Sequence, residues 1–129
     1  MRFLLDTHIW LWSLHDPSRL GKRVLEELSN PENELWLSPI STWEALMLNA
    51  KGKIRLAADL SQWVAQATAP LREAPLTHEI ALAARQLPLP QNDPPDRFLA
   101  ATAQTLHLTL VTADRNLLGL GDISTLANR

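Results

Sequence analysis

The 129-residue chain contains no cysteine and no tyrosine, and it has only two phenylalanines and four glycines. Without cysteine the protein can form neither disulfides nor metal-thiolate sites, and it cannot use a cysteine nucleophile. No apolar run approaches the roughly 20 residues of a membrane-spanning helix. Asp6 follows the first apolar residues too early for a secretory signal peptide. We therefore expect a soluble cytoplasmic protein with no membrane partner.

The chain also lacks a strong excess of charge of either sign, since 12 Lys and Arg stand against 14 Asp and Glu. The net charge of -2 gives no global attraction to nucleic acid, so any such binding needs a local basic patch or metal ions. Apolar residues make up 46% of the sequence, which is typical of a globular protein. By length we expect residues 1–129 to form a single domain.

Short β-rich runs alternate with segments whose apolar residues recur at helical spacing. The expected strands are 2–5, 34–38, 71–76, 108–112 and 123–126. The expected helices are 9–14, 18–28, 41–50, 59–67, 77–87 and 94–107. Strands that alternate with helices predict an α/β layer fold built on a parallel sheet.

The stretch from Asp93 to Asp114 brings two acids to one level. Asp93 has the features of a helix N-cap, Pro94 suits the first helical turn, and Asp96 occupies the third helical position. A helix of about 12 residues runs roughly 18 Å, and the five-residue strand after it returns roughly 17 Å in the opposite sense. Asp114 should therefore return to the level of Asp96.

Two further acids follow the first two strands. Asp6 comes directly after the first, and Glu44 is expected in the first turn of the helix after the second. In a parallel sheet the carboxyl ends of the strands share one edge, so Asp6, Glu44, Asp96 and Asp114 should meet there. Ionised carboxylates 4 Å apart repel by about 1 kcal/mol in water and about 4 near a protein surface. Mg²⁺ or Mn²⁺, which prefer oxygen ligands, would relieve this repulsion and support phosphodiester hydrolysis.

Each acid also has an ordinary structural explanation. Ser41-x-x-Glu44 matches a capping box, in which Glu44 would bond the backbone N–H of Ser41. Asp93 and Asp96 would then be a cap and a first-turn acid, and Asp114 would begin a plain turn. Only the joint placement of the acids favours a functional site.

Four short motifs follow one another along the chain: Leu4-Leu5-Asp6-Thr7-His8, Ser41-Thr42-Trp43-Glu44, Asp93-Pro94-Pro95-Asp96-Arg97 and Val111-Thr112-Ala113-Asp114. In order and spacing they resemble the motifs of PIN-domain ribonucleases, and most closely the VapC-like toxins of bacterial type II toxin–antitoxin pairs. The resemblance covers essentially the whole chain. It implies a PIN-like three-layer α/β fold, with a central parallel sheet of about five strands flanked by helices, and a homodimer.

The resemblance also implies a Mg²⁺- or Mn²⁺-dependent endoribonuclease that a small cognate antitoxin inhibits by inserting into the active-site groove. The family's catalytic and metal-binding acids carry over onto Asp6, Glu44, Asp96 and Asp114, and its supporting hydroxyl onto Thr112. The Asp-Thr-His opening suggests an antitoxin of the Phd/YefM type. Pro95 stands where an aromatic residue is more usual, a departure that bears on packing more than on chemistry.

Several basic residues are candidates for contacts with RNA phosphates: Lys51, Lys53, Arg55, Arg97 and Arg115. A basic run after a helix is more often a solvated helix end, and that explanation stays open.

The five tryptophans could stack on bases, but packing in the core and at a subunit contact is the favoured interpretation. Trp10 and Trp12 are two positions apart and cannot share one helical face. One of them is therefore expected at a dimer or antitoxin surface.

Other functions also fit an acid after the first strand. Aspartate-nucleophile phosphatases carry a second Asp two residues later, where this chain has His8, and they need a later lysine, whereas none follows Lys53. The missing lysine argues equally against a phospho-accepting receiver domain. A PIN-fold binding module without activity and a metal-dependent phosphatase remain alternatives.

Overall fold

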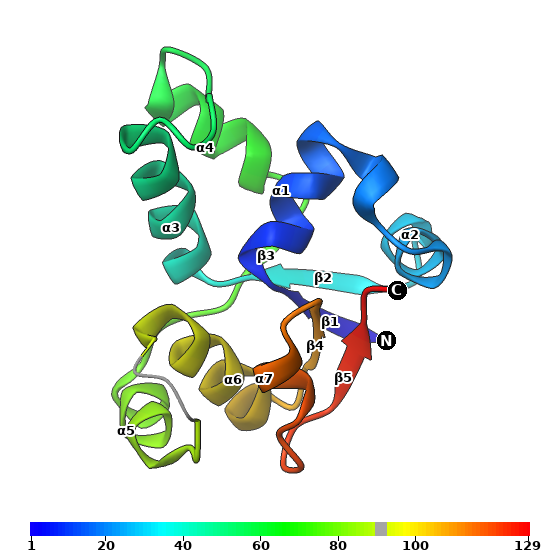
Figure 1. Cartoon of the computed structure of the whole chain (residues 1–129), viewed down its shortest axis with the longest axis vertical. Coiled ribbons are helices and arrows are strands. Elements are labelled where there is room, and N and C mark those ends of the chain that lie inside the picture. The colour runs from blue at the N-terminus through cyan, green and yellow to red at the C-terminus, as the bar shows by residue number, and fades with distance from the viewer. Residues whose placement is uncertain (90–92) are drawn as a thin grey trace.

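Five parallel strands form one sheet at the centre of the computed structural model, which describes residues 1–89 and 93–129 (Figure 1). The strands are β1 (Arg2–Leu5), β2 (Glu34–Leu37), β3 (Arg72–Glu73), β4 (Thr109–Thr112) and β5 (Thr125–Ala127), in the spatial order β3-β2-β1-β4-β5. The central strand β1 pairs with β2 and β4, so that Leu4 lies between Trp36 and Leu110. The carboxyl ends of β1 and β4 therefore lie side by side.

Helices cover both faces of the sheet (Figure 1). They are α1 (Thr7–His15), α2 (Lys22–Ser29), α3 (Pro39–Ala50), α4 (Leu60–Thr68), α5 (His78–Gln86), α6 (Pro94–Leu106) and α7 (Arg115–Leu118), with a 3₁₀ turn η1 (Pro17–Arg19). Helices α1 to α4 lie on one side of the sheet and α5 to α7 on the other. The predicted three-layer parallel architecture is confirmed. None of the helices described is long and apolar enough to cross a membrane.

The apolar side chains of β1 divide between two cores. Successive residues of a strand point to opposite faces of the sheet. Phe3 and Leu5 accordingly pack in one cluster with Trp10 of α1, whereas Leu4 packs in the other with Leu99 of α6. All five side chains are at most 2% exposed. Both faces of β1 are thus buried, which holds its carboxyl end rigidly in the middle of the molecule.

One predicted helix is wrong. The segment 18–28 was expected to be one continuous helix, but it divides into η1 and α2 because Leu20 and Gly21 are extended. Leu20 is 6% exposed and belongs to the core, and the N–H of Gly21 donates to the side chain of Asn128 at 2.7 Å. These tertiary contacts interrupt the helical pattern. The other predicted helices agree with the structure to within two residues at each end, and β3 is shorter than the expected strand 71–76.

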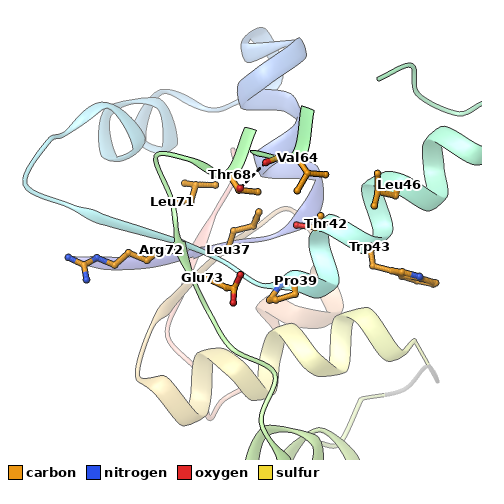
Figure 2. Close-up of a pocket in the computed structure, with 10 residues that line it drawn as sticks. All are labelled: Leu37, Pro39, Thr42, Trp43, Leu46, Val64, Thr68, Leu71, Arg72 and Glu73. Carbon is orange, nitrogen blue, oxygen red and sulfur yellow. Dashed lines mark hydrogen bonds between the residues drawn. The ribbon is translucent and has the colours of Figure 1, made fainter. Parts of the chain in front are cut away.

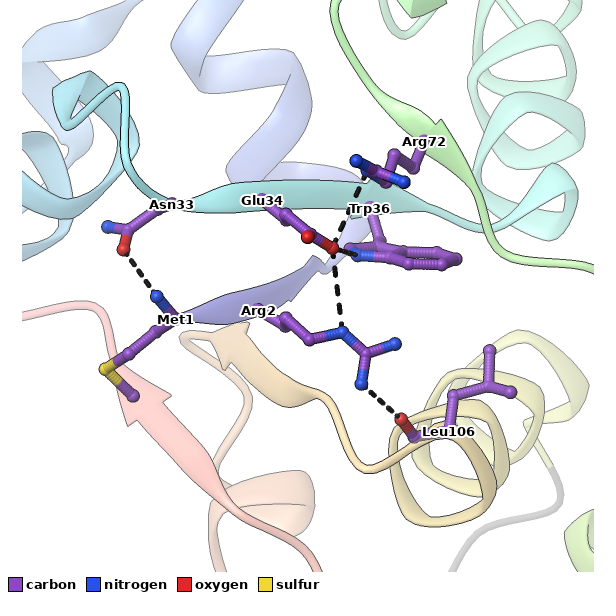
Figure 3. A network of polar contacts seen from close by, with 7 residues as sticks. All are labelled: Met1, Arg2, Asn33, Glu34, Trp36, Arg72 and Leu106. Atoms are coloured by element: carbon purple, nitrogen blue, oxygen red, sulfur yellow. Dashed lines mark hydrogen bonds and ion pairs between the residues drawn. The ribbon is translucent and has the colours of Figure 1, made fainter.

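A polar cluster ties the strands together at their amino ends (Figure 3). Glu34 Oε1 lies 3.6 Å from the Nε atoms of both Arg2 and Arg72 and accepts a hydrogen bond from Trp36 Nε1 at 3.2 Å. The two guanidinium groups lie 5.2 and 5.9 Å from the centre of the Trp36 ring. Half-exposed ion pairs and cation–π contacts contribute about 1 kcal/mol or less each. This cluster stabilises the end of the sheet opposite to the one that carries Asp6.

Candidate active site

Asp6 lies directly after β1, at the carboxyl end of the central strand, and is 8% exposed. It is the N-cap of α1, where its Oδ1 accepts the N–H of Thr7 at 2.7 Å. Its Oδ2 accepts the hydroxyl of Thr112, the last residue of β4, at 2.6 Å. Burial raises the pKa of the Asp6 carboxyl, and these two hydrogen bonds oppose that rise. Each carboxylate oxygen keeps a second lone pair for another partner.

Asp114 is joined to Asp6 through Thr112. The N–H of Asp114 donates to Thr112 Oγ1 at 3.0 Å, and the same hydroxyl donates to Asp6. Asp114 is the N-cap of α7, and its Oδ1 accepts the N–H of Asn116 at 2.8 Å. The short helix replaces the plain turn that was expected after Asp114. The predicted supporting position of Thr112 is matched by a buried hydroxyl that connects two of the four acids.

Glu44 reaches the site from α3, and its local setting differs from the prediction. The N-cap of α3 is Ser38, whose Oγ accepts the N–H of Ile40 at 3.1 Å, and Pro39 is the first helical residue. The capping box at Ser41 is therefore wrong, and Glu44 lies in the second turn instead of the first. Its Oε1 accepts the hydroxyl of Thr7 at 2.5 Å.

Burial is the main cause of a raised pKa at Glu44. The charges of Asp6 and Asp93 also raise it, whereas the hydrogen bond from Thr7 lowers it. A second hydrogen bond, 2.9 Å long, joins Thr7 Oγ1 and Ser41 Oγ. Thr7, which follows Asp6 in the sequence, thus connects α1 to α3 and holds Glu44 beside Asp6.

The amino end of α6 supplies two acids, as predicted. Asp93 is the N-cap, and its Oδ1 lies 3.4 Å from the N–H of Asp96, the third helical residue. Burial raises the pKa of Asp96 to about 8, with further contributions from the charges of Asp93, Asp6 and Asp114. This carboxyl therefore sits in a strongly anionic environment.

One pocket of about 400 Å³ contains all of these acids. It is lined by Asp6, His8, Trp12, Glu44, Asp93, Asp96, Ala113 and Asp114. The four acids predicted from the sequence come from four separate segments and are brought together here. Asp93, for which a capping role was favoured over that of an additional outer-shell acid, caps α6 and also lines the pocket.

The chemistry of these donors fits a hard divalent cation, because every candidate ligand is a carboxylate oxygen. Burial, with a contribution from neighbouring carboxylates, raises the pKa values of Asp6, Glu44 and Asp96, so a bound cation would stabilise their charged forms. Among residues 1–89 and 93–129, however, no group of three or more acidic or histidine side chains is already arranged to hold a metal ion. The acids share a pocket without forming a ready-made set of ligands.

Replacing Thr112 by Val is expected to destabilise the protein by about 2 kcal/mol, because Asp6 and the N–H of Asp114 both lose a hydrogen-bond partner. Thermal unfolding should shift down by roughly 5–10 °C. Thr112→Ser keeps the hydroxyl and should recover most of the loss. Thr109→Val, at an exposed hydrogen bond of the same strand, is the matched control and should change little. Equal melting temperatures for Thr112→Val and the wild type would contradict this role.

The basic residues predicted to contact phosphates fall into two groups. Lys51, Lys53 and Arg115 are exposed. Arg97, by contrast, donates from Nη1 to the carbonyls of Ala84 and Leu87 at 3.0 and 3.1 Å, and from Nη2 to that of Leu89 at 3.3 Å. Its guanidinium fastens the end of α5 to α6. We therefore assign Arg97 a structural role in place of the predicted phosphate contact.

A second hollow, of about 310 Å³, adjoins the acidic pocket and shares His8 and Trp12 with it. Arg19 and Arg55 line this hollow, and the guanidinium of Arg19 lies 4.7 Å from the centre of the Trp12 ring. Arg55 belongs to the basic run noted in the sequence. Arg19 was missed, because in the sequence it looks like one more charge on a helix surface.

The tryptophans differ in exposure. Trp10 is 1% exposed in the core, Trp12 is half-buried beside the acidic pocket, and Trp43 is 53% exposed. Figure 2 shows Trp43 pointing outward from α3, at the rim of a largely apolar hollow of about 410 Å³ between α3, α4 and β3. A subunit or antitoxin surface at Trp12 stays a prediction.

The sequence and the fold are similar to those of known proteins. The family model of the PIN domain matches residues 3–122. Ribonuclease VapC22 of Mycobacterium tuberculosis is 33% identical over 115 residues, which cover 88% of each protein.

Two solved structures show the same fold at low sequence identity. A chain of VapBC2 from Rickettsia felis, bound to a promoter DNA fragment, aligns over 100% of both chains with a TM-score of 0.72 and 15% identity. A chain of DNA-bound VapBC from Salmonella typhimurium aligns over 98% of both chains with a TM-score of 0.73 and 18% identity.

Proposed function

The chain belongs to the PIN-domain family, and from that premise we propose that it is an endoribonuclease that hydrolyses RNA phosphodiester bonds with Mg²⁺ or Mn²⁺. The observation that carries the proposal is the gathering of Asp6, Glu44, Asp96 and Asp114 in one pocket. The name of the relative, ribonuclease VapC22, supports RNA as the substrate.

Asp6, Asp96 and Asp114, together with Glu44, are the residues that would hold the cation. When bound, such an ion lowers the pKa of a water molecule and compensates the negative charge that develops on the phosphate. Thr112 and Thr7 keep the carboxyl groups of Asp6 and Glu44 in fixed orientations through hydrogen bonds. Glu44, whose pKa is raised by burial, is suited to orient the attacking water and to accept its proton.

Basic side chains beside the acids would guide the RNA backbone. Arg19 and Arg55 line the adjoining hollow, and Lys51, Lys53 and Arg115 are exposed. Phosphate contacts of this kind position a nucleic acid without reading its sequence. Because the net charge of the chain is -2, the attraction for RNA would come from these local basic side chains.

We further propose that the protein is the toxin of a type II toxin–antitoxin pair in the cytoplasm. It would act as a homodimer and be inhibited by a cognate antitoxin, for which the Phd/YefM type is the expected class. Support comes from the solved structures of similar fold, which include a toxin–antitoxin complex from Klebsiella pneumoniae with a TM-score of 0.65 over 96% of this chain. Toxicity on expression that is relieved by the neighbouring reading frame would test this assignment.

The enzymatic proposal is tested by incubating the purified chain with structured and unstructured RNA, with Mg²⁺ or Mn²⁺ and with EDTA. We expect RNA cleavage that requires the cation and stops in EDTA. p-Nitrophenyl phosphate, added in parallel, tests for a phosphatase. We expect no nitrophenolate release, because Asp6 is 8% exposed and hydrogen-bonded through both oxygens, which is unfavourable for a nucleophile.

A metal-free binding module is the second candidate. It is favoured by one observation, the lack of a ready-made group of metal ligands among the described residues. RNA binding without cleavage under every metal condition would select this candidate over the nuclease.

A further inference from the structure

One face of α3 is only partly packed against the core: Ile40 lies against the edge of a core cluster, whereas Trp43 and Met47 belong to neither of the two clusters described. Ile40, Trp43, Glu44 and Met47 follow the i, i+3, i+4, i+7 spacing and therefore share a face of the helix. Such spacing usually marks a face packed against a core. Here the four residues line an open hollow of about 470 Å³, and the indole of Trp43 is 53% exposed.

The opposite wall of this hollow is the amino end of α6. Asp93, Pro94 and Pro95 line it there. Glu44 and Asp93 also line the acidic pocket, so the apolar hollow and the acidic pocket share a wall. A molecule whose reacting group lies among the acids can therefore extend across this wall into the hollow that Trp43 lines.

The chemistry of the hollow indicates which part of an RNA would occupy it. A second phosphate is disfavoured, because Glu44 and Asp93 line the hollow and, among residues 1–89 and 93–129, no basic residue lines it. A nucleobase is uncharged and planar, and it stacks well on an indole ring. We propose that Trp43 stacks on the nucleobase beside the scissile phosphate of a single-stranded RNA, an inference that rests on the proposed function.

The strand must be single at this point, because a base inside a duplex is already stacked and paired. Lys51, the C-cap of α3, lies eight positions after Trp43 on the continuation of the same face. It is exposed and would contact a phosphate further along the RNA. Trp43 therefore acts through binding, and the sequence tolerance of base stacking predicts little discrimination among bases at this position.

A second copy of the chain fits this hollow less well. A two-fold contact presents the same patch from both partners. If it were centred on this hollow, it would bring Glu44 and Asp93 of both copies together and bury like charges. An unpaired base brings no charge to the same place.

The first test compares the steady-state cleavage of a single-stranded RNA oligonucleotide by variants. Trp43→Ala should raise KM about tenfold, while kcat stays within about twofold, because a stacking contact holds the ground state and the transition state alike. Trp43→Phe keeps an aromatic face and should lie close to the wild type. Leu82→Ala is the matched control, since Leu82 is a 62% exposed apolar residue that does not line the hollow, and it should change nothing.

The second test is a binding titration with fluorescein-labelled RNA that carries either a normal or an abasic nucleotide beside the cleavage site. The wild type should lose about tenfold in affinity for the abasic RNA, whereas Trp43→Ala should bind both equally. Equal KM values for Trp43→Ala and the wild type, or the same loss with the abasic RNA in both proteins, would overturn the inference. The inference would also be overturned if sedimentation showed that Trp43→Ala changes from dimer to monomer and that this change accounts for its higher KM. If the wild type cuts no RNA, the proposed function fails, and the titration is then repeated with the abasic nucleotide at each position of the RNA in turn; a wild type that loses affinity at no position would overturn the stacking on Trp43.

Discussion

Replacing Asp6 with Asn is expected to lower the rate of RNA cleavage on the order of 1,000-fold without unfolding the protein. Asn is as good an N-cap as Asp, so α1 keeps its first hydrogen bond from Thr7. The substitution removes the negative charge and one of the two oxygens. In place of Oδ2 it puts an amide nitrogen that donates, so the hydroxyl of Thr112 loses its acceptor there. Under the proposed function, the asparagine would therefore hold a cation more weakly than Asp6.

The matched control is Asp59→Asn. Asp59 is an exposed N-cap of α4 whose Oδ1 accepts the N–H of Gln62 at 3.0 Å, and it does not line the acidic pocket. This variant should cleave RNA like the wild type. Circular dichroism and thermal unfolding of both variants separate a lost site from a lost fold. Undiminished cleavage by Asp6→Asn would count directly against the acidic pocket as the active site.

Replacing Asp96 with Asn is expected to abolish cleavage and yet stabilise the protein in EDTA at pH 8. The pKa of Asp96 in the folded protein is raised to about 8 from an ordinary value of 3.8. A carboxyl with a raised folded-state pKa favours folding fully below its unfolded pKa, and this contribution is lost as the pH rises through the folded value. The metal-free wild type should therefore lose stability between about pH 4 and pH 8. Burial also raises the pKa values of Asp6 and Glu44, so these two groups contribute to the same loss of stability as the pH rises.

Asn at position 96 removes the charge that burial and the neighbouring acids disfavour. After a discount for solvent screening at a half-buried group, we expect a gain of about 1–2 kcal/mol, or roughly 3–10 °C in melting temperature at pH 8. At pH 4 the difference should be small, because Asp96 is then protonated. Melting curves in EDTA across this range provide the measurement, with Asp59→Asn again as the control. A wild-type melting temperature that does not change with pH would show that burial and the neighbouring acids do not raise the pKa of Asp96.

The candidate site was predictable because its residues lie next to strong local signals. The pattern at Asp93 and Pro94 predicts the start of α6, and the structure has Asp93 as N-cap and Asp96 as the third helical residue. Helix length and strand length together predict the return to Asp114, and both acids line one pocket. Proline is favoured at the first helical position, so Pro39 also marks the start of α3 in the sequence. The capping-box pattern at Ser41 instead predicted a start two residues later.

Other features depend on contacts between distant segments and leave no local signal. Arg97 looks like a free cation in the sequence, but three carbonyls near the end of α5 occupy its guanidinium. The helical pattern across Leu20 is interrupted by burial in the core. The exposure of Trp43 depends on which face of α3 is turned away from the sheet. Sequence patterns identify the acids, and only the assembled fold distinguishes the side chains around them.

Three helices begin at the acidic pocket: α1 after Asp6, α6 after Asp93 and α7 after Asp114. The aligned peptide dipoles of a helix place about half a positive charge at its first turn, and α1 and α6 are long enough to do so in full. These helix ends therefore offset part of the negative charge of the acidic pocket, and no chelator can remove that share, although the carboxylates outweigh it when no cation is bound.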